Sequence, residues 1–147
     1  MGNTFWRDDL CRQIAMMPDF IREHEFYRQE RFGIGAKCKC DGVSKKLRVI
    51  LELKGLSVST EKAFKDSLLH LDYDQGATWY LNVASCDWLK YRELGHYFEY
   101  KLIVGISKIH TDLMFKMLID RNHPYYKSGL EKVKFGVHIW KDVYGFQ

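Results

Sequence analysis

The stretch DGVSKKLRVILELK, residues 41–54, carries charged side chains at the end of a segment that otherwise has the composition of a buried strand. A turn at Gly42 separates Asp41 from an apolar run that ends with Glu52 and Lys54. Successive side chains of a strand point to opposite faces, so Glu52 and Lys54 are predicted to share one face. If Asp41 lies on the neighbouring antiparallel strand, two carboxylates and a lysine converge. That composition is typical of a divalent-metal site with a cationic or general-base partner.

Hydrophobic periodicity around this stretch predicts a mixture of helices and strands. Apolar side chains at helical spacing predict a helix over residues 5–19, and residues 20–28 either extend it or form a strand. Thr60 is suited to cap a helix, and Gly129 is expected to interrupt the last helix. The remaining expected elements are a hairpin of residues 36–43 and 47–54, helices at 61–70, 75–83 and 125–135, strands at 100–107 and 113–119, a turn at Gly33 and Gly35, and an exposed connection over 87–95. This order predicts an α/β domain with a central mixed sheet and helices covering its faces.

The bulk composition fits one folded domain spanning residues 1–147. Hydrophobic residues make up 46% of the chain and charged residues 29%, which excludes a disordered chain. The net charge of +4 is compatible with a polyanionic partner. The longest apolar run is too short to cross a bilayer, so no membrane partner is expected. The four cysteines lack the spacing of a zinc site, and we expect reduced thiols in a cytoplasmic protein.

Further motifs follow the opening stretch in a fixed order along the chain. They are GAKCKCDGV at 35–43, ILELK at 50–54, AF at 63–64, YDQGATWYL at 73–81 and LIVGISK at 102–108. In this order the chain resembles the RecE-like exonucleases of phages and prophages, members of the PD-(D/E)XK nuclease superfamily. The resemblance implies a restriction-endonuclease-like core and metal-dependent hydrolysis of DNA phosphodiester bonds.

The resemblance also implies roles for residues of the opening stretch. Asp41 and Glu52 match the two carboxylates that ligate the catalytic Mg²⁺ or Mn²⁺, and the backbone carbonyl of Leu53 matches a further ligand. Lys54 matches the lysine that orients or activates the attacking water, or stabilises charge on the phosphate. Because like charges at one site disfavour joint ionisation, at least one of Asp41 and Glu52 is expected to have a raised pKa without metal.

An upstream acidic ligand and a helical DNA-holding motif complete the family pattern. Glu23 and Glu25 are both candidates for the acid, and the strand register alone does not choose between them. Tyr80 matches the tyrosine of the helical Gln-x-x-x-Tyr motif. Aligning Tyr80 puts Gly76 where the glutamine belongs and leaves Gln75 one residue early, which is a rotation of about 100° on a helix.

Lys37 and Lys39 alternate onto the same strand face as Asp41, so they are candidates for contacting the DNA backbone or, equally, ordinary edge-strand lysines. The favoured function is a deoxyribonuclease, an exonuclease of phage or prophage recombination. A catalytically degenerate member that binds DNA or protein, and a small structure-specific endonuclease, remain as alternatives. DNA is the expected partner, with a second copy of the chain or a recombination protein as candidate protein partners.

Overall fold

The computed structural model of the protein describes residues 2–28, 36–85 and 97–144. Five strands form one sheet in the order β1-β2-β3-β4-β5. β3 and β4 run parallel, and the other neighbouring pairs are antiparallel. The strands are β1 (Ile21–Arg28), β2 (Ala36–Ser44), β3 (Val49–Leu56), β4 (Tyr100–Ser107) and β5 (Met114–Ile119). The predicted central mixed sheet is confirmed.

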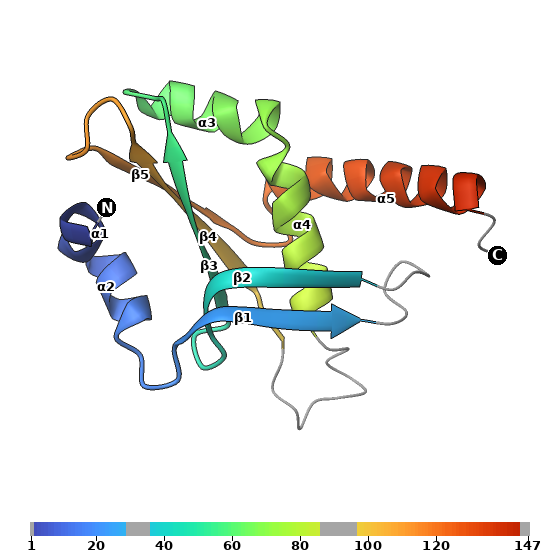
Figure 1. The fold of residues 1–147 in the computed structure, drawn as a ribbon, viewed down its shortest axis with the longest axis horizontal. Coiled ribbons are helices and arrows are strands. Elements are labelled where there is room, and N and C mark those ends of the chain that lie inside the picture. Colours follow the sequence, from blue (N-terminus) through green and yellow to red (C-terminus); the bar gives the residue numbers. More distant parts are fainter. Residues whose placement is uncertain (1, 29–35, 86–96, 145–147) are drawn as a thin grey trace.

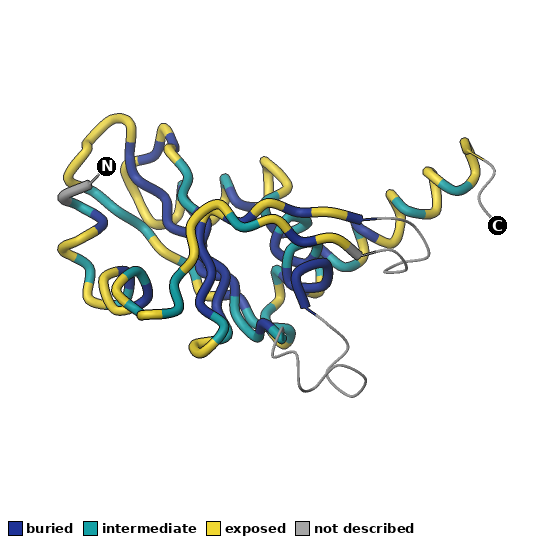
Figure 2. The backbone as a smooth tube through the Cα atoms, turned by 60° about the horizontal axis from the view of Figure 1, so that its bottom comes forward, coloured by how far each residue is buried: buried dark blue, intermediate teal, exposed yellow. Residues whose placement is uncertain are grey.

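Helices flank both faces of this sheet (Figure 1). They are α1 (Gly2–Arg7), α2 (Asp9–Ala15), α3 (Glu61–His70), α4 (Tyr73–Ala84) and α5 (Pro124–Tyr144). Apolar side chains of α1 and α2 pack with β3 and β4 on one face. Side chains of α3, α4 and α5 pack on the other face, again over the central strands. β3 and β4 are therefore buried from both sides, whereas the far half of α5 extends into solvent (Figure 2).

The first helical segment differs from the single helix expected over residues 5–19. Asp8 divides it into α1 and α2, because the Asp8 Oδ1 atom accepts the backbone N–H of Cys11 at 2.9 Å and so caps a new helix. α2 ends at Ala15, and β1 begins at Ile21. Of the two alternatives for residues 20–28, the structure has the strand.

The hairpin and the capped helix follow the predicted pattern. β2 and β3 form the hairpin, and the Thr60 hydroxyl accepts the Ala63 N–H at 3.1 Å at the start of α3. α4 begins at Tyr73, two residues earlier than expected, because the chain turns at Asp72 with a left-handed φ of 59°. The expected turn at Gly33 and Gly35 and the connection over 87–95 lie outside the described residues.

The expectation that Gly129 interrupts the last helix is wrong. α5 runs without a break from Pro124 to Tyr144. A Cβ atom at Gly129 would collide with the backbone carbonyl of Asp74 and the hydroxyl of Thr78. The glycine thus allows a close approach of α5 to α4, and Thr78 Oγ1 donates to the Tyr126 carbonyl at 2.8 Å beside it. Close packing outweighs the weak helix propensity of glycine here.

No helix in the described ranges is both long enough and apolar enough to cross a membrane.

Candidate active site

The side chains of Glu52 and Lys54 project from β3 on the face that α4 covers. Glu52 Oε1 lies 3.2 Å from Lys54 Nζ, so the predicted placement on one face is confirmed. Glu52 is buried, whereas 33% of the Lys54 side chain is exposed. The Lys54 Nζ atom also lies over the ring of Tyr73 in α4, 4.9 Å from its centroid. Lys54 is therefore a partly exposed cation that contacts a buried carboxylate.

A second lysine, Lys101 of β4, reaches Glu52 from the neighbouring strand. Lys101 is fully buried, and its Nζ contacts Glu52 Oε2. The same ammonium lies 3.9 Å from the centroid of the Tyr80 ring. Lys101 was not predicted as a site residue, although the sequence holds a signal for it. Alternation places Lys101 on the inward face with Ile103 in an apolar strand, which is the same pattern that identified Glu52.

The two lysines determine the ionisation of Glu52. Burial alone would raise its pKa, but the charge and hydrogen bond of Lys101, and then those of Lys54, hold the Glu52 pKa below its ordinary value. The expectation of a raised pKa is therefore wrong for Glu52, because its nearest charged neighbours are cations and not a second carboxylate. Burial tends to lower the Lys54 pKa, but the charge of Glu52 raises it overall. Burial, followed by the Glu52 charge, raises the pKa of Tyr80 to about 12.

Asp41 lies where the ladder between β2 and β3 ends. The last paired residues are Gly42 and Leu51, and one further step in register sets Asp41 opposite Glu52. Beyond the last paired residues, the Asp41 Oδ2 atom accepts a hydrogen bond from the backbone N–H of Leu53, the residue after Glu52, at 2.8 Å. The N–H and C=O of one strand residue point to the same side in an antiparallel ladder, so the Leu53 carbonyl faces the Asp41 side of β3 as well.

Asp41 and Glu52 lie on different faces of the sheet. Asp41 and Leu53 border a cavity that is also lined from α1 and α2, whereas Glu52 points to α4 and is held by its two lysines. The structure therefore does not show the expected convergence of both carboxylates with Lys54. The charge of Asp41 contributes to the raised pKa of Lys54, so this ammonium lies within electrostatic reach of both carboxylates. A divalent ion shared by Asp41 and Glu52 stays a prediction.

The two candidate upstream acids occupy different surroundings. Glu23 lines the same cavity of about 670 Å³ as Asp41 and Leu53, and its backbone has a left-handed φ of 51°. Glu25 lies further along β1 and accepts a hydrogen bond from the Tyr27 hydroxyl at 2.8 Å. The structure therefore brings Glu23, and not Glu25, to the cavity of Asp41.

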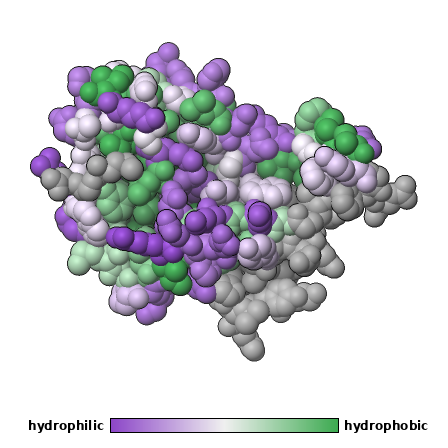
Figure 3. All heavy atoms as spheres, viewed as in Figure 1, coloured by the Kyte–Doolittle hydropathy of each residue, from purple (hydrophilic) through white to green (hydrophobic). Residues whose placement is uncertain are grey.

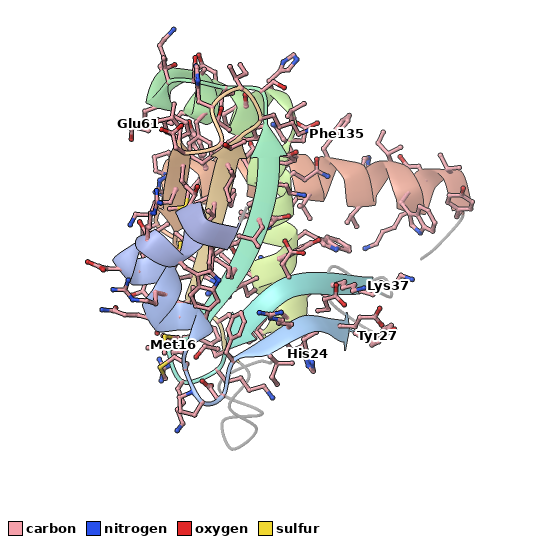
Figure 4. The ribbon with its side chains drawn as sticks, turned by 60° about the vertical axis from the view of Figure 1, so that its left-hand side comes forward. Met16, His24, Tyr27, Lys37, Glu61 and Phe135 are labelled. Carbon is pink, nitrogen blue, oxygen red and sulfur yellow. The ribbon has the colours of Figure 1, made fainter. Side chains whose placement is uncertain are left out.

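Three of the four predicted DNA-binding residues border a second cavity, of about 390 Å³. Its lining consists of Glu25, Tyr27, Lys37, Cys38, Lys39, Trp79 and Tyr80. Hydrophilic side chains predominate along the β1–β2 hairpin in the view of Figure 3. Tyr27 and Lys37 lie beside each other near the end of that hairpin (Figure 4). The Trp79 indole donates to the Lys37 carbonyl at 3.0 Å and so ties α4 to β2.

Gln75, the fourth predicted residue, is not brought to this cavity. It lines a separate groove of about 190 Å³ between α4 and α5, opposite Val133. Gly76 instead faces the ion pair of Glu52 and Lys101, because a Cβ atom there would lie 3.8 Å from Lys101 Nζ. Gly76 and Tyr80 are one helical turn apart and share that face. The one-residue offset seen in the sequence therefore separates Gln75 from the site in space.

The oxygen donors around Asp41 are of the kind that a divalent cation binds. Mg²⁺ prefers oxygen ligands, is usually bound through one or two carboxylates, and keeps several waters. Asp41, Glu23 and Leu53 line the same cavity, and Glu52 is the neighbour of Leu53 in β3 with its side chain on the other face. In the part of the chain that the structure describes, no three His, Cys, Asp or Glu side chains converge as a complete ligand set. An ion held here would rely on the carbonyl and on water as well.

Comparison with known proteins places the fold among solved structures. No family model and no curated protein matches the sequence. A crystal structure from Eubacterium rectale, named "Putative exonuclease", matches with a TM-score of 0.66 and 19% sequence identity. The match covers 97% of this chain and 51% of that one, so the chain spans about half the length of its structural neighbour. The chain thus has an α/β fold, a mixed five-stranded sheet flanked by helices, that it shares with this neighbour.

Proposed function

We propose that the protein is a metal-dependent deoxyribonuclease, an exonuclease of phage or prophage recombination. The observation that carries the proposal is the grouping of Glu52 and Lys54 on β3 beside the bond between Asp41 and the Leu53 N–H. The name of the Eubacterium rectale neighbour points to the same class of activity.

The reaction requires a water nucleophile and neutralisation of charge on the phosphate. A bound Mg²⁺ or Mn²⁺ supplies a Lewis acid and an activated water. Asp41 and the Leu53 carbonyl would hold the ion, with Glu52 and Glu23 as further oxygen donors. Lys54 is a partly exposed cation beside these donors, and a point charge of this kind is suited to a phosphate oxygen.

A DNA strand would reach this centre along the β1–β2 hairpin. Lys37 and Lys39 offer charges for the phosphates. The ring of Tyr27 lines the same cavity and is exposed, so it is suited to stacking on bases.

The decisive experiment compares linear with covalently closed circular DNA. The chain with Mg²⁺ is expected to degrade linear duplex from an end and to spare the circles, because an exonuclease needs a free terminus. Product is followed on gels, with EDTA as the control that removes the ion. Cutting of closed circles would favour the structure-specific endonuclease.

A binding-only protein is the second candidate, and one contact favours it. Lys101 already neutralises Glu52 without a metal ion. Tight DNA binding with no product over hours in Mg²⁺ or Mn²⁺ would support that alternative.

The path assigned to DNA makes a separate prediction. Lys37→Glu or Lys39→Glu is expected to weaken DNA binding in EDTA and to reduce the slope of log affinity against log salt by about one for each phosphate that the protein no longer neutralises. Fluorescence anisotropy over a salt series measures this slope. Lys62→Glu is the matched control, since Lys62 lies on α3 with 89% of its side chain exposed. An unchanged slope would place both hairpin lysines away from the DNA.

A further inference from the structure

Lys101 differs from the other lysines of the described chain in being fully buried. Its ammonium has three N–H donors, yet no acceptor other than Glu52 is within its reach among the described residues. The face of the Tyr80 ring provides the rest of its favourable surroundings. The free-energy cost of burying the Lys101 charge is offset mainly by its ion pair with Glu52, so loss of Glu52 would leave a buried charge without compensation.

The surroundings of the pair show why an ammonium fits at this point. Backbone pairing with Ile50 and Ile119 fixes the start of the Lys101 side chain in the sheet. Its far end lies near Gly76, where any larger residue would occupy the adjoining space. The lysine stem is flexible, with four carbons between backbone and ammonium. A movement away from Glu52 would therefore take the ammonium into the space beside Gly76, inside the protein, while the strand stays in place.

Both carboxylate oxygens of Glu52 are held by cations of the protein itself. Lys54 contacts Oε1, and Lys101 contacts Oε2. A divalent cation placed on the same carboxylate would be repelled by both ammonium groups, and the repulsion is strong in a poorly solvated interior. Lys54 is partly exposed and can turn toward solvent. Lys101 is fully buried, so its side chain can move only within the protein.

We infer that Lys101 is the resident counter-ion of Glu52 and competes with a divalent metal ion for that carboxylate. The inference rests on the proposed function, because it assigns Glu52 to the metal site. In this arrangement Lys101 keeps the metal-free protein folded and lowers the affinity for the ion. Binding of the ion to Glu52 requires the Lys101 ammonium to move away.

The test is Mn²⁺ binding to the whole chain, followed by electron paramagnetic resonance of free Mn²⁺ and by the melting temperature. Lys101→Met is expected to bind Mn²⁺ at least roughly tenfold more tightly than the unaltered chain, an effect in the usual range of coupled binding. Its melting temperature should be lower in EDTA and should rise more on addition of Mn²⁺. Lys116→Met is the matched control, because Lys116 pairs with Asp8 at the surface of neighbouring β5.

Equal or weaker Mn²⁺ binding by Lys101→Met would overturn the competition. The metal site itself would still stand if Asp41→Ala removed Mn²⁺ binding from the unaltered chain. Absence of Mn²⁺ binding in every variant would overturn both the competition and the metal-dependent activity, so the two failures are distinguishable.

A second variant covers the case in which Lys101→Met does not fold without metal. Lys101→Gln removes the charge but provides an amide N–H that can donate a hydrogen bond toward Glu52. If both variants fold only when Mn²⁺ is present, as seen by circular dichroism, the ion replaces the lysine as inferred. If both remain unfolded at saturating Mn²⁺, the competition is refuted.

Discussion

Glu52→Ala is expected to lower the free energy of unfolding by about 3–5 kcal/mol, because it leaves the buried Lys101 ammonium without its partner. This loss is large against the stability of a typical domain. Removing one carboxylate from a pair of like charges would have the opposite sign. The measurement is urea unfolding in EDTA at neutral pH, where Glu52 is ionised.

Two further variants isolate the cause. Glu99→Ala removes the carboxylate of a half-exposed pair with Arg48 and is expected to cost at most about 1 kcal/mol. Glu52→Leu combined with Lys101→Met removes both charges and should recover most of the loss. A Glu52→Ala chain as stable as the unaltered one would show that Lys101 finds other partners.

The pH dependence of this contribution follows from the direction of the pKa. The folded-state pKa of Glu52 lies below its ordinary value of 4.5. Glu52 therefore stabilises the fold above that value, and the contribution is lost as the pH falls through the lowered pKa. In Glu52→Ala this part of the acid sensitivity should be absent.

Lys54→Ala is expected to slow DNA hydrolysis by at least about a hundredfold while leaving the fold and Mn²⁺ binding nearly intact. Lys54 provides the partly exposed cation of the site, and the fold does not depend on it, since Lys101 still neutralises Glu52. Asp41→Ala, in contrast, should remove both Mn²⁺ binding and hydrolysis. Single-turnover cleavage of end-labelled duplex and calorimetric Mn²⁺ titration separate these two effects.

Lys108→Ala is the matched control for Lys54→Ala. Lys108 is exposed, and its side chain lies next to Gly55, the residue that follows Lys54. Its removal should leave cleavage unchanged. Cleavage retained in Lys54→Ala would show that this lysine belongs to a structural ion pair and not to the reaction.

Local patterns in the sequence predicted the features that depend on neighbouring residues. The shared face of Glu52 and Lys54 follows from strand alternation, and the Thr60 cap follows from the preferences of helix ends. Lys101 escaped prediction because the parallel pairing of β3 and β4 brings it to Glu52 from a distant part of the chain. Alternation within β4 marks Lys101 as an inward-facing lysine, but it does not show which strand lies beside β4.

Two other features that the sequence did not predict also depend on the three-dimensional arrangement of the elements. Gly129 has the propensity of a helix breaker, yet the contact of α5 with α4 requires a residue without a side chain there. The choice between Glu23 and Glu25 depended on the shape of β1, whose left-handed residue at Glu23 no periodic pattern indicates. Propensity and periodicity describe single elements, and these features belong to pairs of elements.

The irregular, charged character of β1 also bears on the colloidal behaviour of the protein. β1 and β5 are the two edges of the described sheet. β1 carries Arg22, Glu23 and Glu25 and bends at a left-handed residue, and β5 has Lys116 at its middle. Charges and irregular backbone at an edge discourage the addition of a foreign strand. These features of both edges disfavour edge-to-edge aggregation of the sheet.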